Sequence, residues 1–108
     1  MFSYNLKHDN LYATIQFHGD LDIEVTEMME YEIIPALQQF SHIEIDLQEV
    51  PFVDSTGIGL LLNLIQTFKK GEDGVQVTIT NIQPLVKEVF EMLQLADILG
   101  DEVLSFHS

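Results

Sequence analysis

A chain of 108 residues, of which 46% are hydrophobic, has the size of one domain and enough apolar side chains to bury one core. Its 18 acidic and 4 basic side chains give a formal charge of -14, which repels nucleic-acid phosphates and anionic lipid headgroups, so we expect no nucleic-acid partner. The absence of cysteine excludes disulfides and thiolate nucleophiles. Because no signal-peptide pattern and no apolar run of roughly 18 residues is present, we also expect a cytoplasmic protein without direct membrane insertion.

Two segments near the N-terminus alternate apolar and polar side chains. They are residues 2–7 (FSYNLK) and 11–17 (LYATIQF), and a period of two is typical of strands with one buried face. The pair Asp9-Asn10 between them favours a tight turn. The pattern therefore predicts a β-hairpin.

Residues 25–40 (VTEMMEYEIIPALQQF) carry apolar side chains at nearly helical spacing. These side chains are Met28, Met29, Ile33, Leu37 and Phe40. Thr26 is a candidate N-cap, and the early acidic residues suit the positive end of the helix dipole. Pro35 lies inside this segment, and proline removes an N–H donor and clashes with the preceding turn. We therefore expect the helix to be kinked or broken at Pro35.

The second half of the chain alternates strand patterns with helix patterns. Residues 42–47 (HIEIDL) and 75–80 (VQVTIT) alternate as strands, whereas residues 60–70 (LLLNLIQTFKK) and 82–95 (IQPLVKEVFEMLQL) have helical spacing. The last helix has an apolar stripe that consists of Leu85, Val86, Val89, Phe90 and Leu93. This order predicts a single α/β domain over residues 1–108, with a mixed sheet that opens in a hairpin, continues in parallel strands and packs against helices.

Four residues at the passage from strand to helix, Asp54-Ser55-Thr56-Gly57, support two interpretations. In the first they only begin a helix, because Asp, Ser and Thr oxygens accept hydrogen bonds from the free amides of a first turn. In the second the Ser55 hydroxyl faces solvent, where an added phosphate would meet free N–H groups and the positive end of the helix dipole. Gly57 and Gly59 would then leave the neighbouring backbone open to another protein's loop. The four residues alone leave both interpretations open.

The run FVDSTGIGLLL, residues 52–62, resembles the STAS domain of bacterial anti-sigma factor antagonists, and the resemblance covers nearly the whole chain. Members commonly have Asp-Ser-Ser/Thr-Gly-Leu/Ile-Gly after the third strand, and the serine after the aspartate is phosphorylated by the cognate anti-sigma kinase. Ser55 stands at that position. A second family feature, a Gly-x-Leu-Asp turn after the second strand, matches residues 19–22. One departure is Gln94, where members often have glycine.

The resemblance implies a phosphorylation-controlled protein-binding switch. Unphosphorylated protein would bind an anti-sigma factor with serine kinase activity and release a sigma factor, phosphorylation of Ser55 would prevent this binding, and a phosphatase would reverse it. Asp22, Asp54, Thr56 and Gly57 would neighbour the phosphoacceptor. No catalysis and no cofactor are implied for this chain. The alternative is a non-switching STAS subunit of a stressosome-type scaffold or a lipid-transport complex.

The helix after the motif has an unusually wide apolar face. At about 100° per residue, the apolar side chains between residues 58 and 68 sweep an arc of roughly 200°. Either this helix packs on two sides within its own domain, or Leu60 and Leu62, at the edges of the arc, stay exposed for a partner. We take Ile58, Leu60 and Leu62 as candidate partner contacts.

An enzymatic role, with Ser55 as nucleophile and His18 as its base, is the third hypothesis. A nucleophilic serine needs a base and an oxyanion hole, and the Gly-x-Ser-x-Gly elbow is absent because Val53 stands two residues before Ser55. The histidines and carboxylates lack metal-ligand spacing, and the Gly-Lys-Ser/Thr ending of a phosphate-binding loop is missing. We therefore expect neither catalysis nor a bound metal.

Overall fold

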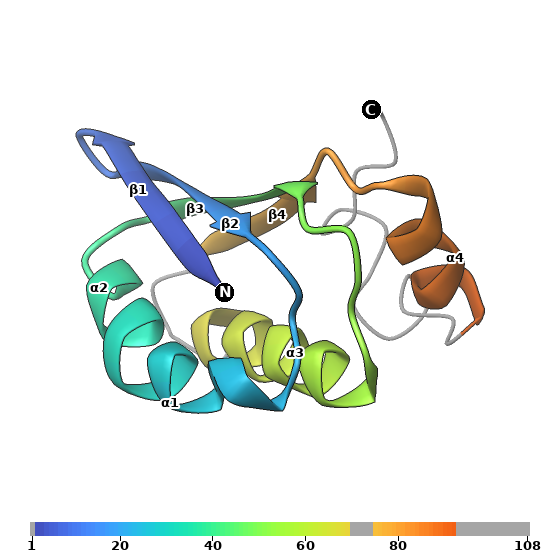
Figure 1. Ribbon diagram of the computed structural model, residues 1–108. Helices are drawn as coiled ribbons and strands as arrows, with labels where there is room; N and C mark the ends of the chain where they lie inside the picture. The colour runs from blue at the N-terminus through green and yellow to red at the C-terminus, as the bar shows by residue number, and fades with distance from the viewer. Residues whose placement is uncertain (1, 70–74, 93–108) are drawn as a thin grey trace.

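One four-stranded sheet with helices on one face organises the chain. The computed structural model describes residues 2–69 and 75–92. The strands are β1 (Ser3–Asp9), β2 (Tyr12–His18), β3 (His42–Glu49) and β4 (Gln76–Thr80), and they lie side by side in that order. β1 pairs with β2 antiparallel, whereas β2 with β3 and β3 with β4 are parallel. This arrangement confirms the predicted hairpin and the predicted mixed α/β sheet (Figure 1).

The turn of the hairpin consists of Asn10 and Leu11, one position later than the predicted pair Asp9-Asn10. Asp9 pairs with Tyr12, so two residues connect the strands, and Asn10 adopts a φ of 54°. Asparagine tolerates this left-handed conformation better than most residues, because its short polar side chain hydrogen-bonds locally. The turn fixes the register that places Ala13, Ile15 and Phe17 on one face of β2.

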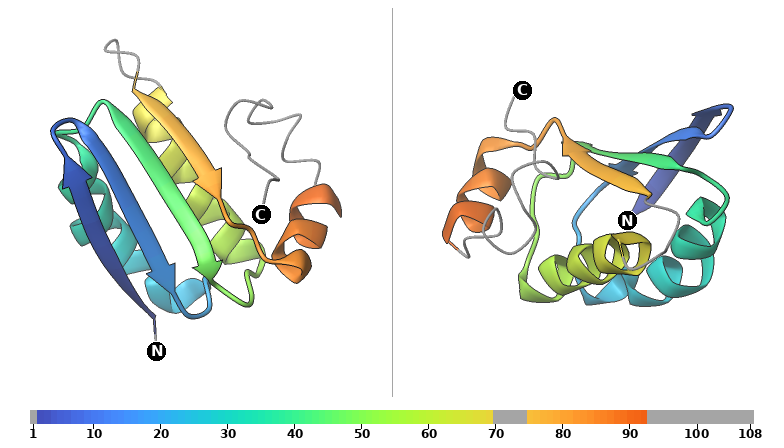
Figure 2. Two further views of the ribbon diagram at one scale, coloured as in Figure 1. Left: turned by 90° about the horizontal axis from the view of Figure 1, so that it is seen from above. Right: turned by 180° about the vertical axis from the view of Figure 1, so that it is seen from behind.

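The helical elements form a layer beneath the sheet, as Figures 1 and 2 show. They are the 3₁₀ turn η1 (Ile23–Val25), α1 (Thr26–Met28), the π-helical turn η2 (Met29–Ile33), α2 (Ile34–Leu37) and α3 (Ser55–Lys69). A further helix, α4 (Pro84–Met92), lies at the side of the domain, beside the loop between β3 and α3. α4 begins at Pro84 within the predicted helical segment 82–95, and Leu93 and Gln94 lie outside the described residues.

Pro35 does not break the second helical segment. Helical conformations continue without a gap from Ile23 to Leu37, and the π-helical turn η2 comes directly before α2, with Pro35 near its start. In η2 the amide of Ile34 donates to the carbonyl of Met29, five residues earlier. We attribute the wide turn to the proline, which cannot donate and crowds the preceding turn. The chain adjusts locally instead of separating into two helices.

The two faces of the sheet differ sharply in chemistry. Alternate residues of β2 and β3, among them Phe17, Ile43 and Ile45, face the helices and are fully buried. The opposite face is polar: Tyr12 stacks on His42 with ring centroids 4.3 Å apart, and its hydroxyl donates to Glu44 at 2.6 Å. Only one face of the sheet therefore contributes to the core.

The structure places the start of α3 and contradicts one prediction about a helix face. α3 begins at Ser55, so the DSTG motif forms its first turn, as the capping interpretation of the motif predicts. Leu85, assigned to the apolar stripe of the last helix, is 68% exposed, whereas Val86 and Phe90 are buried. Leu85 directly follows Pro84 at the start of α4 and lines a surface cavity with Phe52.

Candidate functional site

The site forms where two loops leave the carboxyl ends of neighbouring parallel strands. The loop after β2 runs beside the loop after β3, and Leu21 pairs with Val53 as a parallel bridge. The amide of Leu21 donates to the Phe52 carbonyl at 3.0 Å, and the amide of Asp54 donates to the Leu21 carbonyl at 3.2 Å. Gly19 begins the first loop with a φ of 103°, a conformation that favours glycine. These bonds bring the GDLD and DSTG segments together.

Asp54 is the N-cap of α3. Its Oδ1 accepts a hydrogen bond from the Gly57 amide at 2.8 Å, and its carbonyl accepts one from the Ile58 amide at 2.9 Å. The capping interpretation of the motif is therefore correct for Asp54. Capping by Asp54 does not explain why Ser55 and Thr56 occupy the next two positions of the first turn.

Ser55 is the first residue of α3 and is exposed to solvent. Within residues 2–69 and 75–92, no group forms a hydrogen bond with its hydroxyl. The neighbouring Thr56 is half-buried. The helix therefore presents an unpartnered hydroxyl at its positive end, next to the Asp54 carboxylate.

Asp22, in the loop after β2, is the N-cap of the 3₁₀ turn η1. Its Oδ1 accepts a hydrogen bond from the Glu24 amide at 3.0 Å and so begins the 3₁₀ turn η1. Thr26, predicted as the cap, instead donates its hydroxyl to the Ile23 carbonyl at 2.7 Å, because the helical segment begins earlier than its apolar periodicity suggests. Asp22 therefore holds the loop that pairs with the DSTG segment.

The two glycines of the motif have different environments. A Cβ added to Gly57 would lie 2.1 Å from the Leu21 carbonyl oxygen and 2.9 Å from Val53 Cγ1, so the domain's own packing requires glycine there. A Cβ added to Gly59 would have nothing within 4 Å. Gly57 is buried, which corrects the expectation that it leaves open backbone; that expectation holds for Gly59 alone.

Two of the three residues predicted to contact a partner are buried in the domain. Ile58 is 4% exposed and Leu60 is 8% exposed, because α3 packs against both the sheet and the η1 segment. The wide apolar arc therefore reflects packing on two sides. Leu62 is half-buried and packs against the core, so part of its surface remains accessible.

The sequence interpretation missed an aromatic side chain beside the motif. Phe52 is 52% exposed, three residues before Ser55. It lines an apolar cavity of about 270 Å³ together with Leu85, Val89 and Met92 of α4. The adjacent strand pattern ends at Leu47, so no periodicity distinguished this phenylalanine from a core residue.

His18 is not placed to act as a base for Ser55. It lies on the polar, helix-free face of β2, where Nε2 is 3.1 Å from Nδ2 of Asn5. In the described part of the chain, no group of three or more His, Asp or Glu side chains is arranged to hold a metal ion. No helix there is both long and apolar enough to span a bilayer.

The sequence pattern of a known family, described as the STAS domain, matches residues 3–107. The chain belongs to the STAS domain family. An anti-sigma-B factor antagonist of Staphylococcus epidermidis is 23% identical to this STAS domain over 95 residues, which cover 87% of this chain and 85% of the relative.

Solved structures show the same fold. The anti-sigma factor antagonist SpoIIAA in its unphosphorylated form superimposes with a TM-score of 0.75 at 22% identity, covering 95% of this STAS domain and 86% of that chain. The phosphorylated form of SpoIIAA gives a TM-score of 0.69 at 21% identity, with coverages of 95% and 89%. The murine anion transporter Slc26a9 also matches, with a TM-score of 0.75 at 20% identity over 91% of this STAS domain but 16% of the transporter. The domain is thus similar to anti-sigma factor antagonists and to transporter STAS domains.

Proposed function

We propose that this STAS domain is a cytoplasmic anti-sigma factor antagonist with Ser55 as its phosphoacceptor. Its unphosphorylated form binds an anti-sigma factor with serine kinase activity and thereby releases a sigma factor. The observation that carries this proposal is the exposed, unpartnered Ser55 hydroxyl at the capped start of α3. The relative in Staphylococcus and the existence of a phosphorylated form of SpoIIAA support it.

The site tolerates a phosphate within the folded domain. Phosphorylation adds about -1.5 to -2 charges at neutral pH. The N-terminus of α3 favours a negative charge by about 0.3 to 1 kcal/mol, and the Asp54 carboxylate opposes it. Because both effects are small beside a total stability of about 5 to 15 kcal/mol, the fold survives modification.

A docked partner changes this balance. An interface over Ser55 removes water from the phosphate, and a charge that is left buried without a cation costs several kcal/mol. A loss of about 3 to 4 kcal/mol weakens a complex by a factor of hundreds. Phosphorylation therefore switches binding off without unfolding the domain, and a phosphatase that acts on Ser55 restores it.

The exposed residues around Ser55 form the partner-facing surface. Gly59 lies one turn after Ser55, on the same side of α3, and its open backbone lets a partner's main chain approach closely. Phe52 supplies an exposed aromatic side chain three residues before Ser55. Leu62 contributes the part of its side chain that the core does not cover. These residues replace Ile58 and Leu60 as the expected contacts.

A capture experiment in the protein's own cells tests the proposal. The unmodified chain and Ser55→Ala are used as baits, and mass spectrometry identifies the captured proteins and the phosphate on the recovered wild-type chain. We expect both baits to capture an anti-sigma factor, and only the wild-type chain to carry phosphate at residue 55. Ser41→Ala is the matched control, because this exposed serine precedes β3, at the opposite end of the sheet. Stable recovery in a large assembly without any phosphate on Ser55 would instead indicate the scaffold role.

A further inference from the structure

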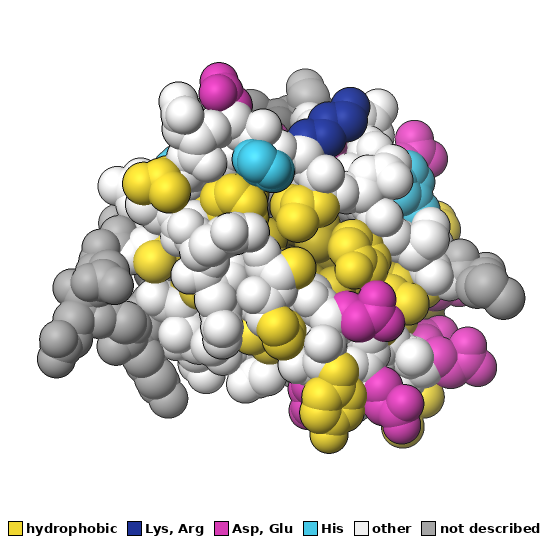
Figure 3. Space-filling view, turned by 90° about the vertical axis from the view of Figure 1, so that its left-hand side faces the viewer, with side chains coloured by type: hydrophobic (Ala, Val, Ile, Leu, Met, Phe, Trp, Pro, Cys, Tyr) yellow, Lys and Arg dark blue, Asp and Glu magenta, His cyan; other side chains and the backbone are white. Residues whose placement is uncertain are grey.

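A second surface lies along the edge strand β1. Phe2, Tyr4 and Leu6 point toward the helical side of the sheet and are half-buried, whereas Phe17, on the adjacent β2, is completely buried. β1 has a strand neighbour on one side only. Figure 3 shows hydrophobic side chains in a band across this side of the molecule, with acidic side chains gathered at one end. The apolar side of β1 is thus incompletely covered.

The opposite wall of this surface comes from the helical segment. Phe2 and Met28 line one cavity of about 230 Å³, and the Tyr4 hydroxyl donates to Oε1 of Glu32 at 3.4 Å. Burial, with a further contribution from Glu32, raises the pKa of the Tyr4 hydroxyl above its usual value. We call the surface formed by Phe2, Tyr4, Leu6, Met28 and Glu32, which is hollowed at its Phe2 and Met28 end, the β1 groove.

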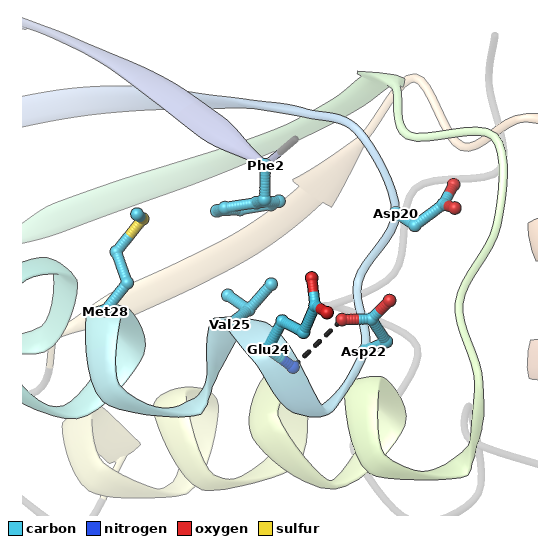
Figure 4. Close-up of a pocket in the computed structure, with 6 residues that line it drawn as sticks. All are labelled: Phe2, Asp20, Asp22, Glu24, Val25 and Met28. Carbon is cyan, nitrogen blue, oxygen red and sulfur yellow. Dashed lines mark hydrogen bonds between the residues drawn. The ribbon is translucent and has the colours of Figure 1, made fainter.

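Carboxylates surround one end of the β1 groove. Asp20, Asp22 and Glu24 line the same cavity as Phe2 and Met28, as the close-up in Figure 4 shows. Among the described residues, no lysine or arginine lines this cavity. The nearby Lys7 lines a separate hollow on the polar face of the sheet. The β1 groove therefore combines an apolar wall with a negative end.

The dimensions of β1 match those of an α-helix. Seven strand residues span about 24 Å, which corresponds to about 16 helical residues. Alternate side chains of a strand recur about every 6.8 Å, close to the rise of about 6 Å between helical positions i and i+4. A helix laid along the groove can therefore place an apolar side chain against each of Phe2, Tyr4 and Leu6.

The negative charge at the acidic end of the β1 groove determines which class of molecule can bind there. A second copy of this chain also carries a charge of -14 and has only 4 basic residues in total, so it repels the acidic end. An anionic lipid surface is repelled for the same reason. A helix with lysine or arginine beside its apolar face is attracted, because its cations meet Asp20, Asp22 and Glu24.

We propose that the β1 groove binds a basic amphipathic helix of a partner protein. The apolar face of that helix packs on Phe2, Tyr4 and Leu6, and its cations lie at the acidic end. The proposal is tested on the chain with Ser55 unmodified, because Asp22 at the acidic end also lies in the loop that pairs with the DSTG segment.

Two synthetic peptides of about 16 residues test this proposal. Both contain the same leucines and lysines, but one has the leucines on a single helical face and the other has them distributed around the helix. We expect the amphipathic peptide to bind at least tenfold more tightly, with NMR shift changes at Phe2, Leu6 and Met28. Leu6→Ser should weaken its binding about tenfold, and Glu24→Gln should weaken it severalfold and reduce its salt dependence. Leu11→Ser is the matched control, because Leu11 is 58% exposed at the hairpin turn, and it should change nothing.

Three results would overturn the proposal. Equal binding of the two peptides would show attraction by net charge alone. Shift changes centred outside the groove would place the peptide elsewhere, and concentration-dependent dimerisation that Leu6→Ser abolishes would assign the groove to a second copy. Thermal melts of each variant separate lost binding from lost folding, and Glu24→Gln provides a second test at an exposed position if Leu6→Ser folds poorly.

Discussion

Substitution of Gly57 and of Gly59 by alanine should have opposite effects on the stability of the domain. In the interior of a helix, alanine is more favourable than glycine by about 0.5 to 1 kcal/mol. At Gly59 the new methyl group meets nothing within 4 Å, so we expect the full gain. For a domain of this size, such a gain raises the melting temperature by several degrees, since about 1 kcal/mol corresponds to roughly 4 to 8 °C.

At Gly57 the same methyl group would lie 2.1 Å from the Leu21 carbonyl oxygen. This oxygen also accepts the hydrogen bond from the Asp54 amide, so moving it disturbs the pairing of the two loops. Forcing an extra methyl group into a packed site costs typically about 1 to 3 kcal/mol, which exceeds the gain in helix propensity. We therefore expect Gly57→Ala to be destabilised by about 1 to 2 kcal/mol.

Urea unfolding of the wild-type chain and the two variants provides the measurement, with thermal melts as a second probe. If Gly59 is a close-approach position for the partner, Gly59→Ala should be more stable yet bind the anti-sigma factor more weakly. The reasoning is refuted if Gly59→Ala loses stability, or if Gly57→Ala is as stable as the wild-type chain. Either result would mean that α3 begins with a different geometry from the one described.

Three further predictions concern the cap, pH and salt. Asp54→Ala should lower the free energy of unfolding by about 0.5 to 2 kcal/mol, whereas Asp54→Asn, which retains an acceptor oxygen, should lose little in the same urea titration. The hydrogen bond to Glu44 is the main cause that raises the pKa of Tyr12, so its stabilising contribution is present below about pH 10 and is lost as the pH rises through the raised pKa. Tyr12→Phe should therefore lose less stability than the wild-type chain between about pH 9 and about pH 11, and equal losses would contradict this. Association with a basic surface of the partner should slow as salt rises, because ions screen the field of a chain with charge -14; a stopped-flow rate that is independent of salt would exclude electrostatic steering.

The sheet was predictable because its side chains alternate. In β2 and β3 every second residue is apolar and buried, and Asn10 provides a residue that tolerates the conformation of the hairpin turn. Helix starts were harder to predict, because η1 and the first turn of α3 depend on the caps Asp22 and Asp54 and precede the apolar periodicity. Periodicity reports the buried face of a helix and gives little information about its first turn.

The accessible surface of the site could not be predicted from α3 alone. Leu60 lies at the edge of the apolar arc and is buried in a domain where α3 packs against both the sheet and the η1 segment. Gly57 and Gly59 are alike in sequence, and they differ only because Leu21 crosses one of them. Both facts depend on contacts between segments that are more than thirty residues apart.

We propose that phosphorylation of Ser55 controls binding to an anti-sigma factor. The most direct test of this proposal is a calorimetric titration of unmodified chain, Ser55-phosphorylated chain and Ser55→Ala against the anti-sigma factor, with circular dichroism melts of all three. We expect similar melting curves for all three chains and tight binding by the unmodified chain and by Ser55→Ala. In the phosphorylated chain we expect the affinity to fall by a factor on the order of hundreds. Equal affinities of the unmodified and phosphorylated chains would contradict the proposal.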